Sequence, residues 1–348
     1  MLPKSGVTPI LRTELSGISP QYNKETKMFN FSLKRRSWWA VLPILALPAS
    51  IAMANETWPS KPIRMIVGFA PGGPTDSAAR FVADGIGKEL GTSVIIENKP
   101  GANGQNAIAE LKRGKPDGYN LLFITSGSLS VAPARFKKLP FDVDKDFDYI
   151  GSVAAYPSLL VTNVNSKFNN VQELIAASKQ AKDGLSAGTV SNTQELTLAL
   201  FKHKTGIQAQ GVPYRGDSHA ITDIAGGILD FAFLSPSVGI PMIENGRVKA
   251  IGVTGELSGP YANKFPKLPM LDVKAWSGIV ALKGTPVEVT QKIGQAMQKV
   301  LSAPEFKKSL ESSGQTVLPL TNDAFRRFVI DEKEMWEKTA ENAGLEKL

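Results

Sequence analysis

The 348-residue chain contains no cysteine and only two histidines, His203 and His219. Without cysteine the fold can form no disulfide and offers no thiolate as nucleophile or metal ligand. Neither histidine lies in an H-E-x-x-H pattern or beside a second ligand type at a fixed spacing. The sequence therefore predicts no bound metal and no cofactor.

Motifs of several large enzyme classes are also missing. There is no Walker A motif, and Gly127–Val131 does not match the G-x-S-x-G pattern, because leucine holds its third position and valine its last. The segment Gly101–Gly104 lacks the third glycine of a dinucleotide-binding fingerprint. Because cysteine is absent and histidine scarce, the usual nucleophile–base pairs cannot be assembled. We predict that the protein is not an enzyme.

An apolar run near the N-terminus is too short and too interrupted for a membrane span. It extends over 17 residues, Trp38–Ala54, and includes two prolines, against roughly twenty apolar residues for a span. The basic patch Lys34–Arg36 precedes it, and Ala52-Met53-Ala54 ends it. This pattern is typical of a cleavable secretory signal, predicted here at residues 28–54 with the cut after Ala54.

Export to the periplasm of a Gram-negative bacterium is the destination that we predict from this signal. The pair Arg35-Arg36 also suits a twin-arginine signal, but one basic pair is not specific, so we predict the Sec route ahead of it. Residues 1–27 are polar, lack apolar periodicity and precede Met28. We expect them to be a non-native or disordered extension outside the fold.

The positive charge of the chain lies largely in this leader. Residues 1–54 contain seven of the 40 basic and two of the 32 acidic residues, so the remainder carries 33 and 30, and its net charge is +3 rather than +8. No basic cluster interleaved with aromatic residues remains, which argues against a nucleic-acid partner. A weakly positive protein suits small anionic ligands.

Strand-like and helical segments alternate after residue 55, which predicts an α/β architecture with mostly parallel sheets. The length of 294 residues favours two sheets. Helices are expected at Asp76–Leu90 and Asp323–Ala343, among others. The strand-like runs are Ile63–Phe69, Ser93–Glu97, Leu121–Thr125, Ser158–Thr162, Gly184–Gly188, Phe231–Ser235, Val248–Val253 and Gly278–Leu282.

The break between the first strand and its helix has two interpretations. Pro71, Gly72, Gly73 and Pro74 separate Ile63–Phe69 from the helix. Either the glycines only allow a tight turn, with Asp76 capping the helix, or the backbone N–H groups of the turn bind an anion such as a carboxylate.

Three further polar loops follow predicted strands, at Ser126–Ser128, Thr189–Thr193 and Ser235–Ser237. Each is compatible with ordinary turn chemistry. Ligands of open α/β sheets, however, bind beyond the carboxyl ends of the strands. The shared position of these loops therefore favours a reversible carboxylate site built from hydroxyls and backbone amides.

Several segments together resemble one protein family. They are Trp58–Ile63, IVGFAPGGPTDSAAR at 66–80, Glu97–Gly104, Pro116–Leu122, Val212–Gly216 and Lys283–Pro286. In order and spacing they resemble the Bug-type receptors, which are the extracytoplasmic solute-binding proteins of tripartite tricarboxylate transporters. The resemblance covers essentially the whole chain after the signal.

The resemblance implies a type II periplasmic-binding fold in which two α/β lobes, joined by a hinge, close over a small carboxylated organic acid. It implies a first lobe at 55–155 and 278–348 and a second lobe at 156–277. The protein is expected to be a monomer that delivers its ligand to membrane permease subunits.

The resemblance also implies which residues contact the ligand. In the first lobe they are Phe69, Pro71, Gly72, Gly73, Thr75, Asp76, Ser126, Gly127 and Ser128; in the second they are Thr189, Ser191, Asn192, Thr193, Tyr214 and Ser235. Two positions depart from the family pattern, where Glu195 and Asp217 place carboxylates beside the expected cleft. Such carboxylates would disfavour highly anionic solutes.

Two other functions fit parts of the sequence. A secreted α/β hydrolase acting on a small ester would share the topology and the exposed serines. The ligand-sensing half of a regulator would share the architecture, but no helix-turn-helix segment precedes residue 58 and export argues against it.

Overall fold

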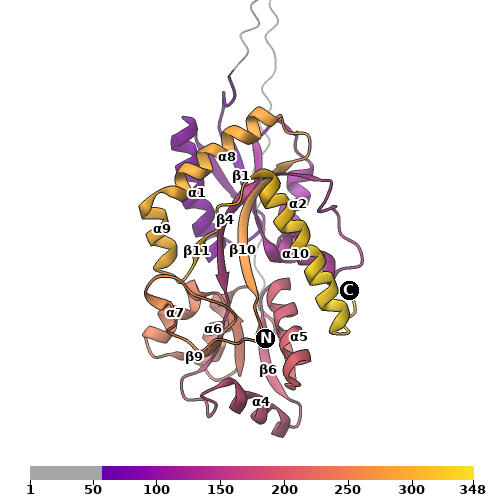
Figure 1. Cartoon of the computed structure of the whole chain (residues 1–348), viewed down its shortest axis with the longest axis vertical. Coiled ribbons are helices and arrows are strands. Elements are labelled where there is room, and N and C mark those ends of the chain that lie inside the picture. The colour runs from indigo at the N-terminus through magenta and orange to yellow at the C-terminus, as the bar shows by residue number, and fades with distance from the viewer. Residues whose placement is uncertain (1–56) are drawn as a thin grey trace, which may run out of the picture. The chain divides into compact units, whose positions relative to one another are not determined.

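The computed structural model describes residues 57–348, which form two β-sheets covered by helices (Figure 1). The predicted extension, signal and cleavage position lie outside the described residues. In the described part of the chain, no helix combines the length and the apolar character needed to cross a membrane.

The first sheet has six strands in the order β11-β4-β10-β3-β1-β2, and the second has five in the order β7-β6-β8-β5-β9. The strands of the first sheet are β1 Ile63–Val67, β2 Val94–Asn98, β3 Asn120–Thr125, β4 Phe147–Pro157, β10 Lys274–Leu282 and β11 Thr316–Val317. Those of the second are β5 Leu159–Asn163, β6 Leu185–Thr189, β7 Ala209–Pro213, β8 Phe231–Leu234 and β9 Val248–Val253.

Each sheet is the centre of one lobe, and the first lobe draws on both ends of the described chain. In Figure 1 the indigo and yellow segments lie in one lobe, and the segments labelled α4 to α7 lie in the other. The chain leaves the first sheet after Pro157 and returns to it at Lys274. The predicted two-lobed α/β fold is confirmed, whereas the lobe boundaries at 155 and 278 stay a prediction.

The expectation of mostly parallel sheets is wrong, because both sheets are mixed. β1 pairs in parallel with β2 and β3, but β10 runs antiparallel to β3 and β4. In the second sheet β6 is parallel to β7 and β8, while β5 is antiparallel to β8 and β9. Parallel neighbours need a crossover connection. β4 instead continues almost directly into β5 of the other sheet, without a helix between them.

Helices pack on both faces of the first sheet, because neighbouring residues of its strands point to opposite faces. Met65, Phe123 and Ile279 lie on one face with Val82 of α1 and Ile293 of α8. Their neighbours Ile66, Leu122 and Val280 contact α2 and α10 on the other face. The helices of this lobe are α1 Pro74–Leu90, α2 Gln105–Lys112, α3 Ala132–Arg135, α8 Val287–Ser302, α9 Pro304–Glu311 and α10 Asn322–Asn342, with the short 3₁₀ turns η1 Ala102–Gly104 and η2 Ser126–Ser128.

The second lobe repeats this arrangement around β5. Leu160 packs with Leu174 and Phe201 on one face. Leu159 packs with Ile221 and Ile240 on the other. The helices are α4 Val171–Gln180, α5 Asn192–Thr205, α6 Asp217–Ala225 and α7 Pro236–Glu244, with the turn η3 Gly259–Tyr261.

Candidate ligand-binding site

The predicted site loops gather at one edge of each sheet. In the first lobe α1 follows β1 and η2 follows β3, and these strands are parallel. In the second lobe α5, α6 and α7 follow β6, β7 and β8, which are parallel as well. Parallel strands end at the same edge, so the loops that follow them lie together there.

Two of these loops contact each other across the lobes. The Asn192 amide Nδ2 donates to the backbone oxygen of Gly127 at 2.8 Å, and the Ser126 and Thr193 hydroxyls lie 3.4 Å apart. Gly127 allows this approach, since a Cβ there would lie 3.1 Å from Thr193 Oγ1. The structure therefore brings the predicted residues of η2 and of the α5 N-terminus together.

A third segment, the turn η1, joins this contact, and the sequence analysis did not assign it to the site. Asn103 Nδ2 donates to Asn192 Oδ1 at 2.9 Å. Gly104 lies so close to Ser128 that a Cβ would come within 2.4 Å of the Ser128 hydroxyl oxygen. The signal in the sequence was the Gly101–Gly104 segment, which entered only the exclusion of a dinucleotide-binding fingerprint and the family resemblance.

The loop between β1 and α1 is fixed by Asp76, which is only 2% exposed. The residue that caps α1 is Gly73, not Asp76, and Pro74 occupies the first turn. The Asp76 carboxylate reaches back from inside the helix and accepts from Gly72 N at 2.9 Å, Arg80 Nε at 2.8 Å and Asn98 Nδ2 at 2.8 Å. The interpretation of Asp76 as the helix cap is therefore wrong.

These contacts keep Asp76 ionised and leave the loop's other donors free. Burial opposes ionisation, but the hydrogen bonds from Arg80, Gly72 and Asn98 outweigh it and hold the pKa of Asp76 below its usual value.

The first N–H groups of a helix have no partner within it. Among the hydrogen bonds of the described residues, the N–H groups of Gly73 and Thr75 have no acceptor.

The hydrogen bonds of this loop all stay within the first lobe. Phe69 uses its backbone oxygen to accept from Asn98 Nδ2 at 2.9 Å. Pro71 and Gly72 are exposed, and Gly73 and Thr75 are half-buried. The structure thus places these residues at the same sheet edge as η2, without a hydrogen bond to the second lobe among the described residues.

Asp217 organises the site loops of the second lobe. One carboxylate oxygen accepts from Gln194 Nε2 at 2.9 Å, and the other accepts from the N–H and hydroxyl of Ser235 at 3.0 and 2.6 Å. The carboxylate thus joins α5, α6 and the residue that precedes α7. Both oxygens of the Asp217 carboxylate already accept hydrogen bonds, from Gln194 and Ser235. This weakens the argument that the Asp217 carboxylate repels anionic solutes.

The remaining predicted residues of the second lobe lie next to this group. The Ser191 hydroxyl caps α5 by accepting from Gln194 N, and Thr189 is buried at the end of β6. The Tyr214 hydroxyl donates to Asp223 at 2.7 Å. Burial and the Asp223 carboxylate raise the pKa of Tyr214 to about 12. A ligand contact from Tyr214 would therefore involve its ring or backbone rather than a free hydroxyl.

Tyr156 is a residue at this junction that the sequence analysis missed. It lies near the end of β4, where the chain passes to the second lobe, and its hydroxyl has no hydrogen-bond partner among the described residues. Burial and the nearby Asp217 carboxylate raise its pKa. Nothing in the local sequence distinguished it from an ordinary strand tyrosine.

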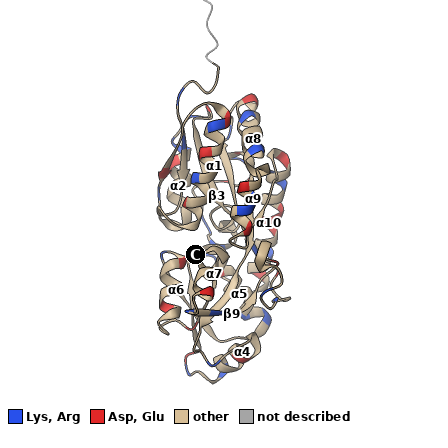
Figure 2. Ribbon diagram, turned by 90° about the vertical axis from the view of Figure 1, so that its left-hand side faces the viewer, with Lys and Arg blue, Asp and Glu red and all other residues tan. Residues whose placement is uncertain are grey.

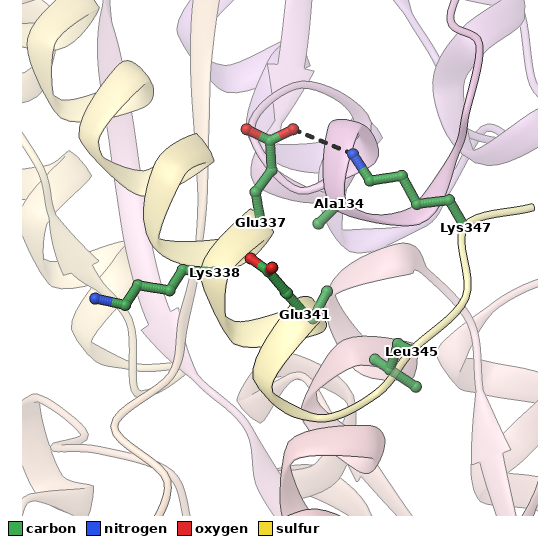
Figure 3. Close-up of a pocket in the computed structure, with 7 residues that line it drawn as sticks. Ala134, Glu337, Lys338, Glu341, Leu345 and Lys347 are labelled. Carbon is green, nitrogen blue, oxygen red and sulfur yellow. Dashed lines mark hydrogen bonds and ion pairs between the residues drawn. The ribbon is translucent and has the colours of Figure 1, made fainter.

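A cavity of about 570 Å³ lies elsewhere, between α3 and the C-terminal end of α10. Figure 3 shows its charged rim, where Lys347 donates to Glu337 at 3.3 Å, and the apolar side chains of Ala134 and Leu345. None of the predicted ligand-binding residues lines it.

Charge and metal-ligand patterns add little to the site. Figure 2 shows basic and acidic residues interspersed on both lobes. In the described part of the chain, no group of three histidine, aspartate or glutamate residues is arranged to hold a metal ion.

Comparisons with known proteins agree with this geometry. Residues 78–345 match the model of the tripartite tricarboxylate transporter family receptor. A UPF0065 protein of Bordetella pertussis is 30% identical over 91% of this chain and 98% of its own length.

Solved structures of similar proteins cover most of the chain. The periplasmic binding protein BugD has a TM-score of 0.77 at 30% identity, over 84% of this chain and 100% of its own. A Rhodopseudomonas palustris protein with adipate has a TM-score of 0.78 at 26% identity, with the same coverage. MatC of the same species, with bound malate, has a TM-score of 0.75 at 26% identity, over 81% of this chain and 100% of its own. The chain belongs to the Bug-type receptor family of the tripartite tricarboxylate transporters.

Proposed function

We propose that this protein captures a small carboxylated organic acid between its lobes and delivers it to the membrane permease subunits of a tripartite tricarboxylate transporter. The observation that carries the proposal is the meeting of η2 with the N-terminus of α5, at the carboxyl ends of strands from both lobes. Backbone N–H groups of helix N-termini and neutral hydroxyls suit reversible carboxylate binding. The adipate and malate in two similar structures support the same ligand class.

The first test is a thermal-shift screen over organic acids, starting with adipate and malate. A ligand that binds only the folded state stabilises it by about 2.7 kcal/mol at a hundredfold excess over Kd. We expect at least one acid to raise the melting temperature and its neutral diamide to leave it unchanged. Equal shifts from acid and diamide, or none from the whole panel, would contradict a carboxylate site.

The hinge can be tested in solution with the acid found in that screen. A ligand shifts the balance between open and closed lobes only through its different affinity for the two states. Small-angle scattering should therefore show a smaller radius of gyration at saturating ligand. An unchanged radius, with binding confirmed by calorimetry, would argue against capture by lobe closure.

Export and cleavage belong to the same proposal. We expect the protein to reach the periplasm by the Sec route, to lose its leader after Ala54 and to act there as a monomer. N-terminal sequencing of the protein from a periplasmic extract should begin at Asn55. The hydrolase alternative is not favoured by the family, and both histidines are exposed on the second lobe.

A further inference from the structure

An ion pair bridges the lobes next to the contact between the site loops. The Arg135 guanidinium Nε donates to Glu195 Oε2 at 2.7 Å, and the two side chains are 25% and 30% exposed. Arg135 ends α3, the helix after η2, and Glu195 lies in the first turn of α5. Each partner is thus close in sequence to predicted ligand-binding residues of its own lobe.

The C-terminal segment holds Arg135 in place. The backbone N–H of Leu348 donates to the Arg135 oxygen at 2.8 Å, and Lys137 N donates to the Leu348 oxygen at 2.9 Å. Arg135 Nη1 also lies 3.5 Å from the backbone oxygen of Glu346. Because these bonds hold the backbone around Arg135 on two sides, less conformational freedom of this segment is lost when Arg135 meets Glu195.

We propose that Arg135 and Glu195 are a positioning pair for ligand capture. The pair joins segments of two lobes, so it forms only when the lobes approach each other as they do in this structure. It therefore lowers the free energy of the arrangement in which η2 and the α5 N-terminus face each other. A ligand that binds between these loops then requires less rearrangement. The ligand class in this inference rests on the proposed function. The contact between the lobes, the Arg135–Glu195 ion pair, does not depend on it.

Glu195 has a competing structural role, because an acidic residue in the first turn stabilises a helix through its dipole. A double-mutant cycle separates the two roles. We would prepare Glu195→Gln, Arg135→Gln and the double variant. Lys112→Gln is the matched control, since Lys112 and Asp146 form an ion pair of similar burial, 33% and 26% exposed, inside the first lobe.

The first measurement is the Kd for malate and adipate by calorimetry. Each single variant should bind about three- to tenfold more weakly, and the double variant no more weakly than either single one. Salt should weaken binding more in the wild type than in Glu195→Gln. Lys112→Gln should bind normally. If Glu195→Gln changes the Kd by the same factor with and without Arg135, Glu195 acts within α5 alone and the proposal fails.

The second measurement needs no ligand and uses the absence of native cysteine. Gln291→Cys on α8 and Gln172→Cys on α4 place dyes on exposed residues of helices at opposite ends of Figure 1. In the ligand-free protein, energy transfer should fall in both single variants and stay unchanged in Lys112→Gln. Unchanged transfer in all variants would overturn the positioning pair. Failure of the proposed function would appear differently, as a wild type that binds no carboxylate while the lobe contact still responds to these substitutions.

Discussion

Replacing Gly73 with valine is expected to weaken carboxylate binding about 100-fold and to lower the melting temperature only slightly, since valine is a poorer helix cap than glycine. Gly73 precedes α1 with φ −80° and ψ 170°, an extended conformation that valine adopts readily. An added Cβ would meet only the Ala70 oxygen, at 3.6 Å. The fold therefore tolerates the side chain, whereas a ligand carboxylate approaching the Gly73 and Thr75 N–H groups does not. Each charge-assisted hydrogen bond lost costs about 1.5–3 kcal/mol.

The control for this prediction is a substitution at another glycine, Gly226. Gly226 also has a φ of −80° and leaves an added Cβ at least 3.5 Å from its neighbours, but it lies at the far end of α6. Gly226→Val should therefore bind normally. Gly72 is unsuitable, because its φ of +80° would strain any other residue. If Gly73→Val is folded and binds like the wild type in calorimetry, the loop is only a turn and the ligand lies elsewhere in the cleft.

Local patterns were sufficient to predict most elements of the fold. The helix expected at Asp323–Ala343 is α10, Asn322–Asn342, and the run at Val248–Val253 is β9 without a shift. Apolar residues recur in α10 with helical spacing and form a nearly continuous run in β9. In both elements several of these residues are buried in the core. β4 was missed, because Gly151 and Ser152 interrupt its apolar residues and weaken the strand signal. Its burial depends on β10, a neighbour 117 residues further along the chain.

The site was predictable as a set of loops but not as a set of contacts. Ser126, Gly127, Asn192 and Thr193 were placed in the site, and the structure joins them across the lobes. The sequence could not show that Glu195 meets Arg135, since the two residues are 60 positions apart and in different lobes. One of the two interpretations of the loop made Asp76 a helix cap, because the pattern of an acidic residue near a helix start does not distinguish the cap from the first turn.

The second large effect is expected at Asp76. We predict that Asp76→Asn lowers the free energy of unfolding by about 2 kcal/mol at neutral pH and also weakens ligand binding. Its carboxylate accepts three hydrogen bonds, from Gly72, Arg80 and Asn98. An amide has one oxygen, so its NH₂ group would face at least one of these donors. Solvent screening reduces the contribution of the Arg80 contact, because that side chain is 52% exposed. The control is Asp84→Asn, which removes a surface pair with Lys88 on the same helix and should cost little.

The loss at Asp76 should also depend on pH in a definite direction. The pKa of Asp76 is lowered in the folded protein, so between that value and the unfolded value of about 3.9 the unfolded chain binds more protons. The stability contributed by the carboxylate is therefore complete above about pH 5 and is lost progressively as the pH falls through the unfolded pKa and on through the folded pKa. We would measure the free energy of unfolding in urea at pH 7, 5, 4 and 3. The difference in this free energy between wild type and Asp76→Asn should be the same at pH 7 and at pH 5. The difference should then narrow at the lowest pH, while Asp84→Asn follows the wild type throughout. A difference that stays the same down to pH 3 would mean that the ionised carboxylate does not hold this loop, and that Gly72 and Gly73 keep their positions through the backbone alone.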